Sequence, residues 1–213
     1  MSQPVEKTIA TESVPTSFNG KVRKAPPLRL PNRATRVREH LTTDEVEMLT
    51  RTAGDSRYGN RDRTLILMMY RHGLRVSEVV ALRWDAVDLK AGTLHVARLK
   101  NGVDSTHPLR GPELRALRRL RRAFPDGPYL FVSERGGPMT DSNVRKIVAL
   151  CGRRAGIGFP VHPHMLRHAC GYKLANDGHD TRSLQHYLGH KNITHTVRYT
   201  EMAPDRFKHF WRD

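Results

Sequence analysis

The sequence predicts a mainly helical domain that carries one small three-stranded antiparallel sheet. Apolar residues recur at helical spacing in most segments beyond residue 40, whereas residues 93–109 have the pattern of strands. Asn101-Gly102 divides that stretch, and this dipeptide is typical of a tight turn between antiparallel strands. The 213 residues are enough for one domain with a real core and a tail.

Residues 1–38 are expected to form a flexible basic tail in front of the folded domain. The tail holds five of the chain's 13 prolines and few large apolar residues. Between Lys21 and Arg38 it carries seven basic residues and no acidic one. Such a segment either follows DNA phosphates or is a solvated leader, and the sequence leaves both interpretations open.

The folded domain is predicted over residues 39–213 and opens with a helix start. Thr42 and Glu45 have the spacing of a capping box, ahead of the apolar Val46 and Leu49. The helical pattern recurs in later segments at 64–71, 77–84, 112–124, 141–154, 164–176, 181–188 and 194–200. Strands are predicted over 93–100 and 103–109, with 129–133 as the third.

The formal net charge of +16, from 37 Lys and Arg against 21 Asp and Glu, favours a polyanionic partner, above all nucleic acid. A protein that is merely basic is the alternative. No apolar run reaches the ~20 residues that a membrane-spanning helix needs, and no signal peptide is recognisable. Cys151 and Cys170 make no disulfide framework, so we expect a cytoplasmic, nucleoid-associated protein with reduced thiols.

Three segments carry the functional signal. Gly73-Leu74-Arg75-Val76-Ser77-Glu78 comes first, His164-Met165-Leu166-Arg167-His168 second, and the third runs from Leu188-Gly189-His190 to Tyr199. In this order, with a lysine on the predicted hairpin, they resemble the catalytic motifs of the tyrosine recombinase (phage integrase) family. Residues 162–168, 190–197 and Arg98-Leu99-Lys100 resemble the recombinases that invert the promoter switch of type 1 fimbriae. The resemblance covers about residues 40–208.

The resemblance implies the tyrosine recombinase catalytic-domain fold and gives catalytic roles to Arg75, Lys100, His164, Arg167, His190 and Tyr199. Tyr199 would attack the scissile phosphorus, form a 3′-phosphotyrosyl link and free a 5′-hydroxyl. Arg75 and Arg167 would hold the non-bridging oxygens, because a guanidinium is always charged and presents a flat donor fork. No cofactor is implied, since the covalent link keeps the energy of the broken bond for rejoining.

The resemblance also assigns the proton transfers. Lys100 would protonate the leaving 5′-oxygen, His164 would move a proton, and His190 would donate a hydrogen bond to the phosphate. His168 is interpreted as structural support. Glu78 either orients a basic side chain or faces solvent, and the sequence favours neither alternative.

Two further interpretations are set aside, namely a metal site built from histidines and a nucleophile other than Tyr199. His162, His164 and His168 could bind metal, but no second pair of ligands with zinc-site spacing accompanies them. Tyr172 and Tyr187 lie on apolar helix faces and are expected in the core rather than as nucleophiles.

The C-terminus is predicted to hold a short helix over residues 204–211 with Phe207, Phe210 and Trp211. These aromatics either pack in their own subunit or dock onto a neighbour, and we favour the neighbour. Most relatives carry a separate helical domain ahead of the catalytic one, where this sequence has only the basic tail. How the chain surrounds a duplex is therefore open.

These expectations favour a site-specific recombinase that acts on double-stranded DNA at specific sites, as a tetramer on DNA, with accessory DNA-bending proteins as further partners. Two alternatives are a non-catalytic DNA-binding regulator on the same scaffold and a type IB topoisomerase that relaxes DNA. The intact residue set argues against the regulator, because binding alone does not need Tyr199. The target sequence, and inversion as against integration or excision, leave no decodable pattern in one chain.

Overall fold

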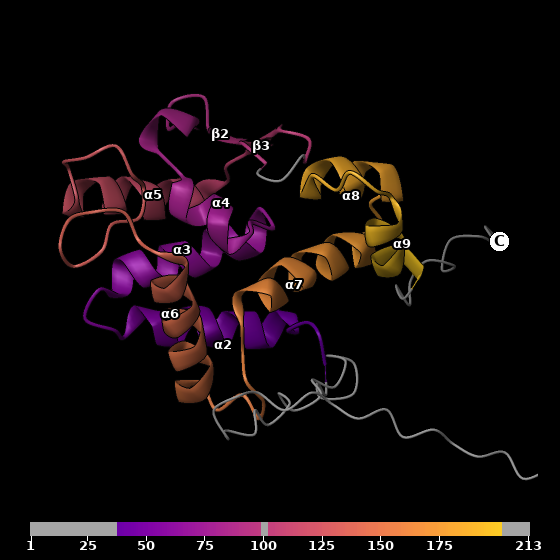
Figure 1. The fold of residues 1–213 in the computed structure, drawn as a ribbon, viewed down its shortest axis with the longest axis horizontal. Coiled ribbons are helices and arrows are strands. Elements are labelled where there is room, and N and C mark those ends of the chain that lie inside the picture. Colours follow the sequence, from indigo (N-terminus) through magenta and orange to yellow (C-terminus); the bar gives the residue numbers. More distant parts are fainter. Residues whose placement is uncertain (1–37, 99–101, 202–213) are drawn as a thin grey trace, which may run out of the picture. The chain divides into compact units, whose positions relative to one another are not determined.

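The computed structural model describes residues 38–98 and 102–201, which fold as helices with one small sheet (Figure 1). The helices are α2 (Thr43–Gly54), α3 (Gly59–Arg71), α4 (Val76–Ala81), α5 (Gly111–Ala123), α6 (Asp141–Arg154), α7 (Pro163–Asn176), α8 (Thr181–Leu188) and α9 (Thr194–Glu201). A 3-10 turn at Trp84–Ala86 follows α4. Residues 1–37 of the predicted tail, Lys100 and the predicted C-terminal docking segment lie outside the described residues.

The capping box at the start of α2 is confirmed. The Thr42 hydroxyl accepts from the Glu45 amide at 3.3 Å, and Glu45 Oε2 accepts from the Thr42 amide at 2.8 Å. α3 begins five residues before its predicted start, because Arg61 and Asp62 are buried there as an ion pair and conceal the apolar period. α4 ends at Ala81 and not at Trp84, since the following chain turns to bond with residues 128–130.

The predicted three-stranded antiparallel sheet is confirmed, but its strands differ from the prediction. The order is β1 (Val87–Asp88), β2 (Thr93–Val96), β3 (Ser105–Pro108). The third strand is therefore β1, whereas residues 129–133 form only isolated bridges at Tyr129 and Val132. The described ladder ends at Val96↔Ser105, shorter than predicted, because the Arg98 amide leaves it to donate to Asp104 Oδ1 at 2.7 Å.

The buried side chains form two clusters. The larger one joins α2, α3, α5, α6 and α7, and it includes Leu117 and Leu120 of α5. The smaller one joins α7, α8 and α9 through Cys170, Leu184, Leu188 and Tyr199, with Tyr172 and Tyr187 packed against it. α8 and α9 thus lie together at the C-terminal end of α7 (Figure 1). Within the described residues, no helix is long and apolar enough to cross a bilayer.

Candidate active site

The first motif places Arg75 at the N-terminus of α4. Its amide donates to Glu78 Oε2 at 2.8 Å, and its Nη1 donates to Glu78 Oε1 at 2.7 Å. The Glu78 side chain is 1% exposed and that of Arg75 is 29% exposed. The structure therefore supports the interpretation in which Glu78 orients a basic side chain, with the guanidinium left accessible to solvent.

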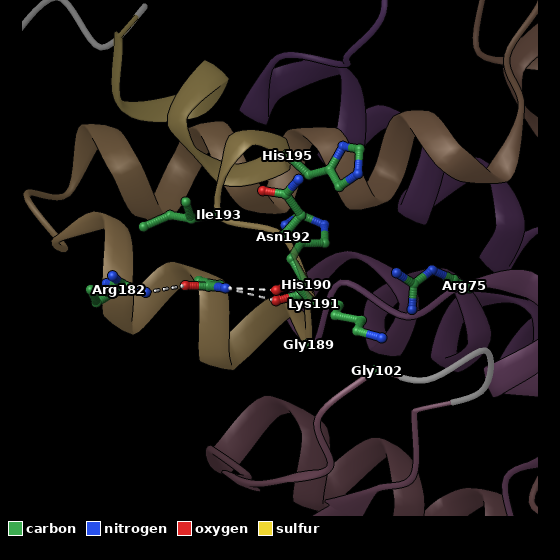
Figure 2. Close-up of a pocket in the computed structure, with 10 residues that line it drawn as sticks. Arg75, Gly102, Arg182, Gly189, His190, Lys191, Asn192, Ile193 and His195 are labelled. Carbon is green, nitrogen blue, oxygen red and sulfur yellow. Dashed lines mark hydrogen bonds between the residues drawn. The ribbon is translucent and has the colours of Figure 1, made fainter.

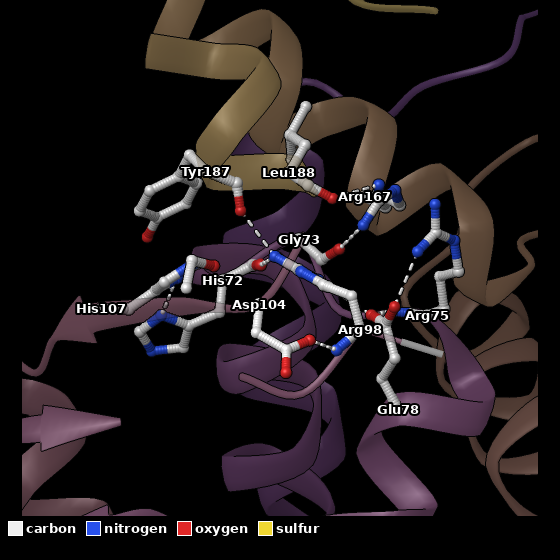
Figure 3. A network of polar contacts seen from close by, with 11 residues as sticks. His72, Gly73, Arg75, Glu78, Arg98, Asp104, His107, Arg167, Tyr187 and Leu188 are labelled. Atoms are coloured by element: carbon white, nitrogen blue, oxygen red, sulfur yellow. Dashed lines mark hydrogen bonds and ion pairs between the residues drawn. The ribbon is translucent and has the colours of Figure 1, made fainter. Parts of the chain in front are cut away.

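Arg98 shares the same carboxylate from the opposite side (Figure 3). Its Nη1 donates to Glu78 Oε2 at 2.8 Å, and its side chain is 0% exposed. Burial alone would raise the pKa of Glu78, but the charge of Arg98 and the hydrogen bonds from Arg75 hold that pKa below its usual value. The carboxylate is thus ionised and fixed between two arginines.

Arg167, from the second motif, is buried at 1% exposure on α7. Its Nη1 donates to the Gly73 carbonyl and its Nη2 donates to the Leu188 carbonyl at 2.6 Å. It forms no ion pair within the described residues, and burial, with repulsion from Arg75 and Arg98, lowers its pKa to about 10. A buried cation without a carboxylate partner favours an anionic ligand.

An open cleft of about 730 Å³ lies between Arg75 and the segment that follows α8 (Figure 2). Its lining residues are Arg75, Gly102, Arg182, Gln185, Gly189, His190, Lys191, Asn192, Ile193 and His195. None of these described residues is acidic, and three carry a permanent positive charge. The cleft therefore attracts an anion such as a phosphodiester.

His190 enters the cleft from a left-handed turn at Gly189, where φ is +64°. Its Nδ1 lies 2.8 Å from the Thr196 hydroxyl. Burial, reinforced by the charges of Arg167 and Arg75, lowers the pKa of His190 to about 3, so the ring is neutral. When the Thr196 hydroxyl donates to Nδ1, the ring carries its proton on Nε2, the form that can donate to a phosphate oxygen.

Tyr199 lies in the smaller cluster with 1% of its surface exposed. Its hydroxyl is 2.7 Å from His168 Nδ1, and its ring centroid is 6.3 Å from that of His190, to which it is nearly parallel. The phenol thus lies behind a residue that lines the cleft. Burial raises the pKa of Tyr199 to about 12, while the nearby charges of Arg198 and Arg167 oppose this rise.

His168 contacts the Tyr199 hydroxyl directly, which the sequence interpretation of structural support did not foresee. Burial and the neighbouring His164 lower the pKa of His168 to about 2, so the phenol is hydrogen-bonded to a neutral ring. Arg198 Nη2 lies 3.1 and 3.2 Å from the two ring nitrogens and donates to Glu39 Oε2 at 2.9 Å. These contacts fix the phenol in its present position.

The structure brings five of the six predicted residues to the junction of α4, α7, α8 and α9, namely Arg75, His164, Arg167, His190 and Tyr199. His164 is exposed, and its ring meets that of His168 edge to face at 4.5 Å. Partial desolvation by the surrounding protein atoms, together with the charge of Arg167, lowers the pKa of His164 to about 4. Lys100 lies outside the described residues. No group of three or more potential metal ligands occurs among the residues that are described.

Sequence reasoning gave no role to Arg98 or Arg198. Arg98 was visible only as part of the Arg98-Leu99-Lys100 motif, and its buried position depends on partners far away in the chain. Arg198 was noted only as the neighbour of the tyrosine, and its contacts with Glu39 and His168 have no local sequence signal.

Comparison with known proteins identifies relatives over most of the chain. The model of the Phage integrase family matches residues 39–206. Type 1 fimbriae regulatory protein FimB of Escherichia coli is 41% identical over 179 residues, 82% of this chain and 90% of the relative. Type 1 fimbriae regulatory protein FimE of the same species is 43% identical over 180 residues, 82% and 91% of the two chains. Tyrosine recombinase XerA of Pyrococcus furiosus is 34% identical over 195 residues, which are 90% of this chain and 67% of the relative.

Solved structures give the same picture of the fold. The crystal structure of XerA recombinase superposes with a TM-score of 0.70 at 27% identity, covering 80% of this chain and 61% of that one. The pre-cleavage complex of XerH site-specific recombinase with difH substrate has a TM-score of 0.68 at 22% identity, covering 82% and 54%. The second likeness, at that low identity, is one of fold.

Proposed function

Because the chain belongs to the phage integrase family and is a tyrosine-type site-specific DNA recombinase, we propose that it cuts and rejoins DNA with Tyr199 as nucleophile. The observation that carries this proposal is the place of the phenol, directly behind His190 at the wall of a cationic cleft. A DNA phosphate in that cleft would meet Arg75 and His190 and lie near the tyrosine.

The phosphate would be held by two arginines and one histidine. Arg75 presents an exposed guanidinium that Glu78 keeps in place. Arg167 has further N–H groups that its two carbonyl bonds leave unused, and His190 would donate through Nε2. Loss of one such preorganised donor typically lowers the rate by a factor on the order of 10²–10³.

Cleavage forms the bond from Tyr199 Oη to phosphorus and breaks the bond from phosphorus to the 5′-oxygen. The products are a 3′-phosphotyrosyl link and a 5′-hydroxyl. A phenol with a pKa of about 12 is protonated at neutral pH, so it must lose its proton during attack. The neutral, exposed His164 is the proposed acceptor, Lys100 the proposed donor to the 5′-oxygen, and rejoining runs these steps in reverse.

The burial of Tyr199 adds a condition to this scheme. A side chain that is 1% exposed cannot contact the phosphorus of a bound duplex. Its hydrogen bond to His168 must therefore break before attack, with a shift of α9. We propose that DNA binding supplies the free energy for this movement.

The proposed partner is double-stranded DNA with paired recombination sites, bound by a tetramer. The net charge of +16 and the cationic cleft support the DNA partner. Similarity to two type 1 fimbriae regulatory proteins supports inversion of a DNA segment as the outcome, ahead of integration or excision. Docking of residues 202–213 onto a neighbouring subunit stays a proposal on residues that the structure does not describe.

The test is to trap the covalent adduct. The purified full chain is incubated with sheared genomic DNA of the organism that encodes it, and the ends of SDS-resistant adducts are sequenced. A substrate nicked beside the mapped position then accumulates adduct, because the short strand with the 5′-hydroxyl diffuses away. A 3′-phosphotyrosyl link should protect the DNA from 3′→5′ exonuclease and leave it open to 5′→3′ digestion.

Two tyrosine variants form the matched comparison. Tyr199→Phe should form no adduct and still bind DNA, whereas Tyr187→Phe, which loses only a bond to the Arg71 carbonyl, should form it. Binding by the wild type without any adduct would reject the proposal in favour of a regulator. Relaxation of supercoiled DNA that lacks paired sites would indicate topoisomerase activity instead.

A further inference from the structure

Two buried arginines hold the segment before Arg75 to the segment before His190. Arg98 Nη2 donates to the His72 carbonyl at 3.3 Å and to the Tyr187 carbonyl at 2.5 Å. Arg167 donates to the next carbonyl along each segment. The bound carbonyls form two adjacent pairs, His72 with Gly73 and Tyr187 with Leu188. Figure 3 shows both guanidinium groups between the two segments.

The stem of Arg98 also shapes the floor of the cleft. A Cβ atom added at Gly189 would lie 2.6 Å from Arg98 Cγ, and one added at Gly102 would lie 2.6 Å from Arg98 Cβ. Both glycines line the cleft, whereas Arg98 itself does not. The arginine therefore supports the surface on which a phosphate would rest without touching it.

Charge connects Arg98 to the exposed arginine of the site. Glu78 binds Arg98 through Oε2 and the Arg75 side chain through Oε1, at 2.8 and 2.7 Å. The Arg75 amide also donates to Oε2 at 2.8 Å, so without Arg98 this oxygen would keep one backbone bond and lose its buried charged partner. The carboxylate would then be free to turn toward Arg75, its one remaining cation. The position of the Arg75 guanidinium therefore depends on Arg98.

We propose that Arg98 is a positioning residue for DNA cleavage, which sets Arg75 and the His190 turn at the separation that the scissile phosphate requires. The inference rests on the proposed function, since it needs a phosphate in the cleft. Lysine cannot replace the arginine, because a single ammonium cannot reach a carboxylate and two carbonyls in one plane. A misplacement of about 1 Å at a reacting centre can cost on the order of 10²-fold in rate.

The experiment compares Arg98→Lys with Arg61→Lys in the full chain. Arg61 is the matched control, because it is also buried, binds Asp62 and one carbonyl, and does not line the cleft. Adduct formation is timed on the nicked substrate with an ordinary scissile phosphate, and then with a methylphosphonate at that position. The methyl group removes the negative charge that Arg75 would neutralise. The rate of adduct formation should therefore depend less on the position of Arg75.

On the ordinary phosphate, Arg98→Lys should slow adduct formation by about 10²-fold, and Arg61→Lys should leave the rate near that of the wild type. On both stereoisomers of the methylphosphonate, the ratio of wild-type to Arg98→Lys rates should fall toward unity. With Arg75→Ala already present, Arg98→Lys should add less loss than it does in the wild type, because the part of its effect that acts through the Arg75 guanidinium is already gone.

Three results would overturn the proposal. These are an unchanged rate in Arg98→Lys, a defect of undiminished size on the methylphosphonate, or effects that multiply in full with Arg75→Ala. If Arg98→Lys does not fold, Arg98→Met combined with Glu78→Gln removes both charges of the buried pair and undergoes the same comparison. Failure of that variant to fold also rejects a positioning role. Absence of any adduct with the wild type instead rejects the proposed function.

Discussion

Replacing Gly171 by alanine tests whether Tyr199 packs against α7 of its own chain. A Cβ atom at this position would lie 2.8 Å from Cε2 and Cζ of the Tyr199 ring and 2.9 Å from Cδ2. These separations are shorter than carbon atoms tolerate, and an aromatic ring cannot bend away. The ring, and with it α9, must shift by several tenths of an ångström.

The expected magnitude follows from two opposing effects. Overpacking a well-filled site lowers the free energy of unfolding by about 1–3 kcal/mol. Alanine in place of glycine inside a helix raises it by about 1 kcal/mol. Gly171→Ala should therefore lower the free energy of unfolding by about 0–2 kcal/mol in the wild type. In a Tyr199→Ala background the clash is absent, so the same change should raise it by about 1 kcal/mol.

Urea unfolding of the wild type, both single variants and the double variant, followed by circular dichroism, gives the coupling energy between the two positions. We expect about 1–3 kcal/mol. Gly111→Ala is the control, because the Cβ there would meet only the mobile end of Arg115 at 3.1 Å and should show no coupling with Tyr199→Ala. A coupling energy near zero, or a Gly171→Ala change that stabilises the wild type, would refute the packing of Tyr199 on α7.

Three further predictions use the same unfolding assay. Burial lowers the pKa of His107 to about 3, of His168 to about 2 and of His190 to about 3. Below pH ~6.5 the unfolded chain takes up protons that the folded chain does not, so each histidine should cost up to about 2 kcal/mol between pH ~6.5 and pH ~5; equal stability at pH ~7 and pH ~5 would contradict this. Thr42→Ala should cost about 1 kcal/mol through loss of the α2 cap, and an unchanged midpoint would count against the cap. Gly189→Ala should destabilise by more than about 1 kcal/mol, because φ is +64° and Arg98 occupies the space; no loss would exclude that conformation.

Motif order and local signals were readable in the sequence. The capping box of α2 was predicted from two residues three positions apart, and α6 and α8 have their predicted bounds. The family motifs led to Arg75, His164, Arg167, His190 and Tyr199, which the structure brings to one junction of helices. Such features depend on neighbours within about one helical turn or on short motifs, and both are visible in a single chain.

The wrong predictions about α4 and the third strand have different causes. α4 stops early because the chain after it bonds to residues 128–130, and the third strand is the two-residue β1, too short to show a period.

The sequence by itself determined which reactive groups this protein carries, because residue types and their order state which groups are present. Only the tertiary structure decided how those groups are held. Arg98 binds carbonyls 26 and 89 positions away, and the Tyr199 hydroxyl meets a histidine 31 positions away. Contacts at such separations follow from the packing of helices against each other, and no local pattern encodes them.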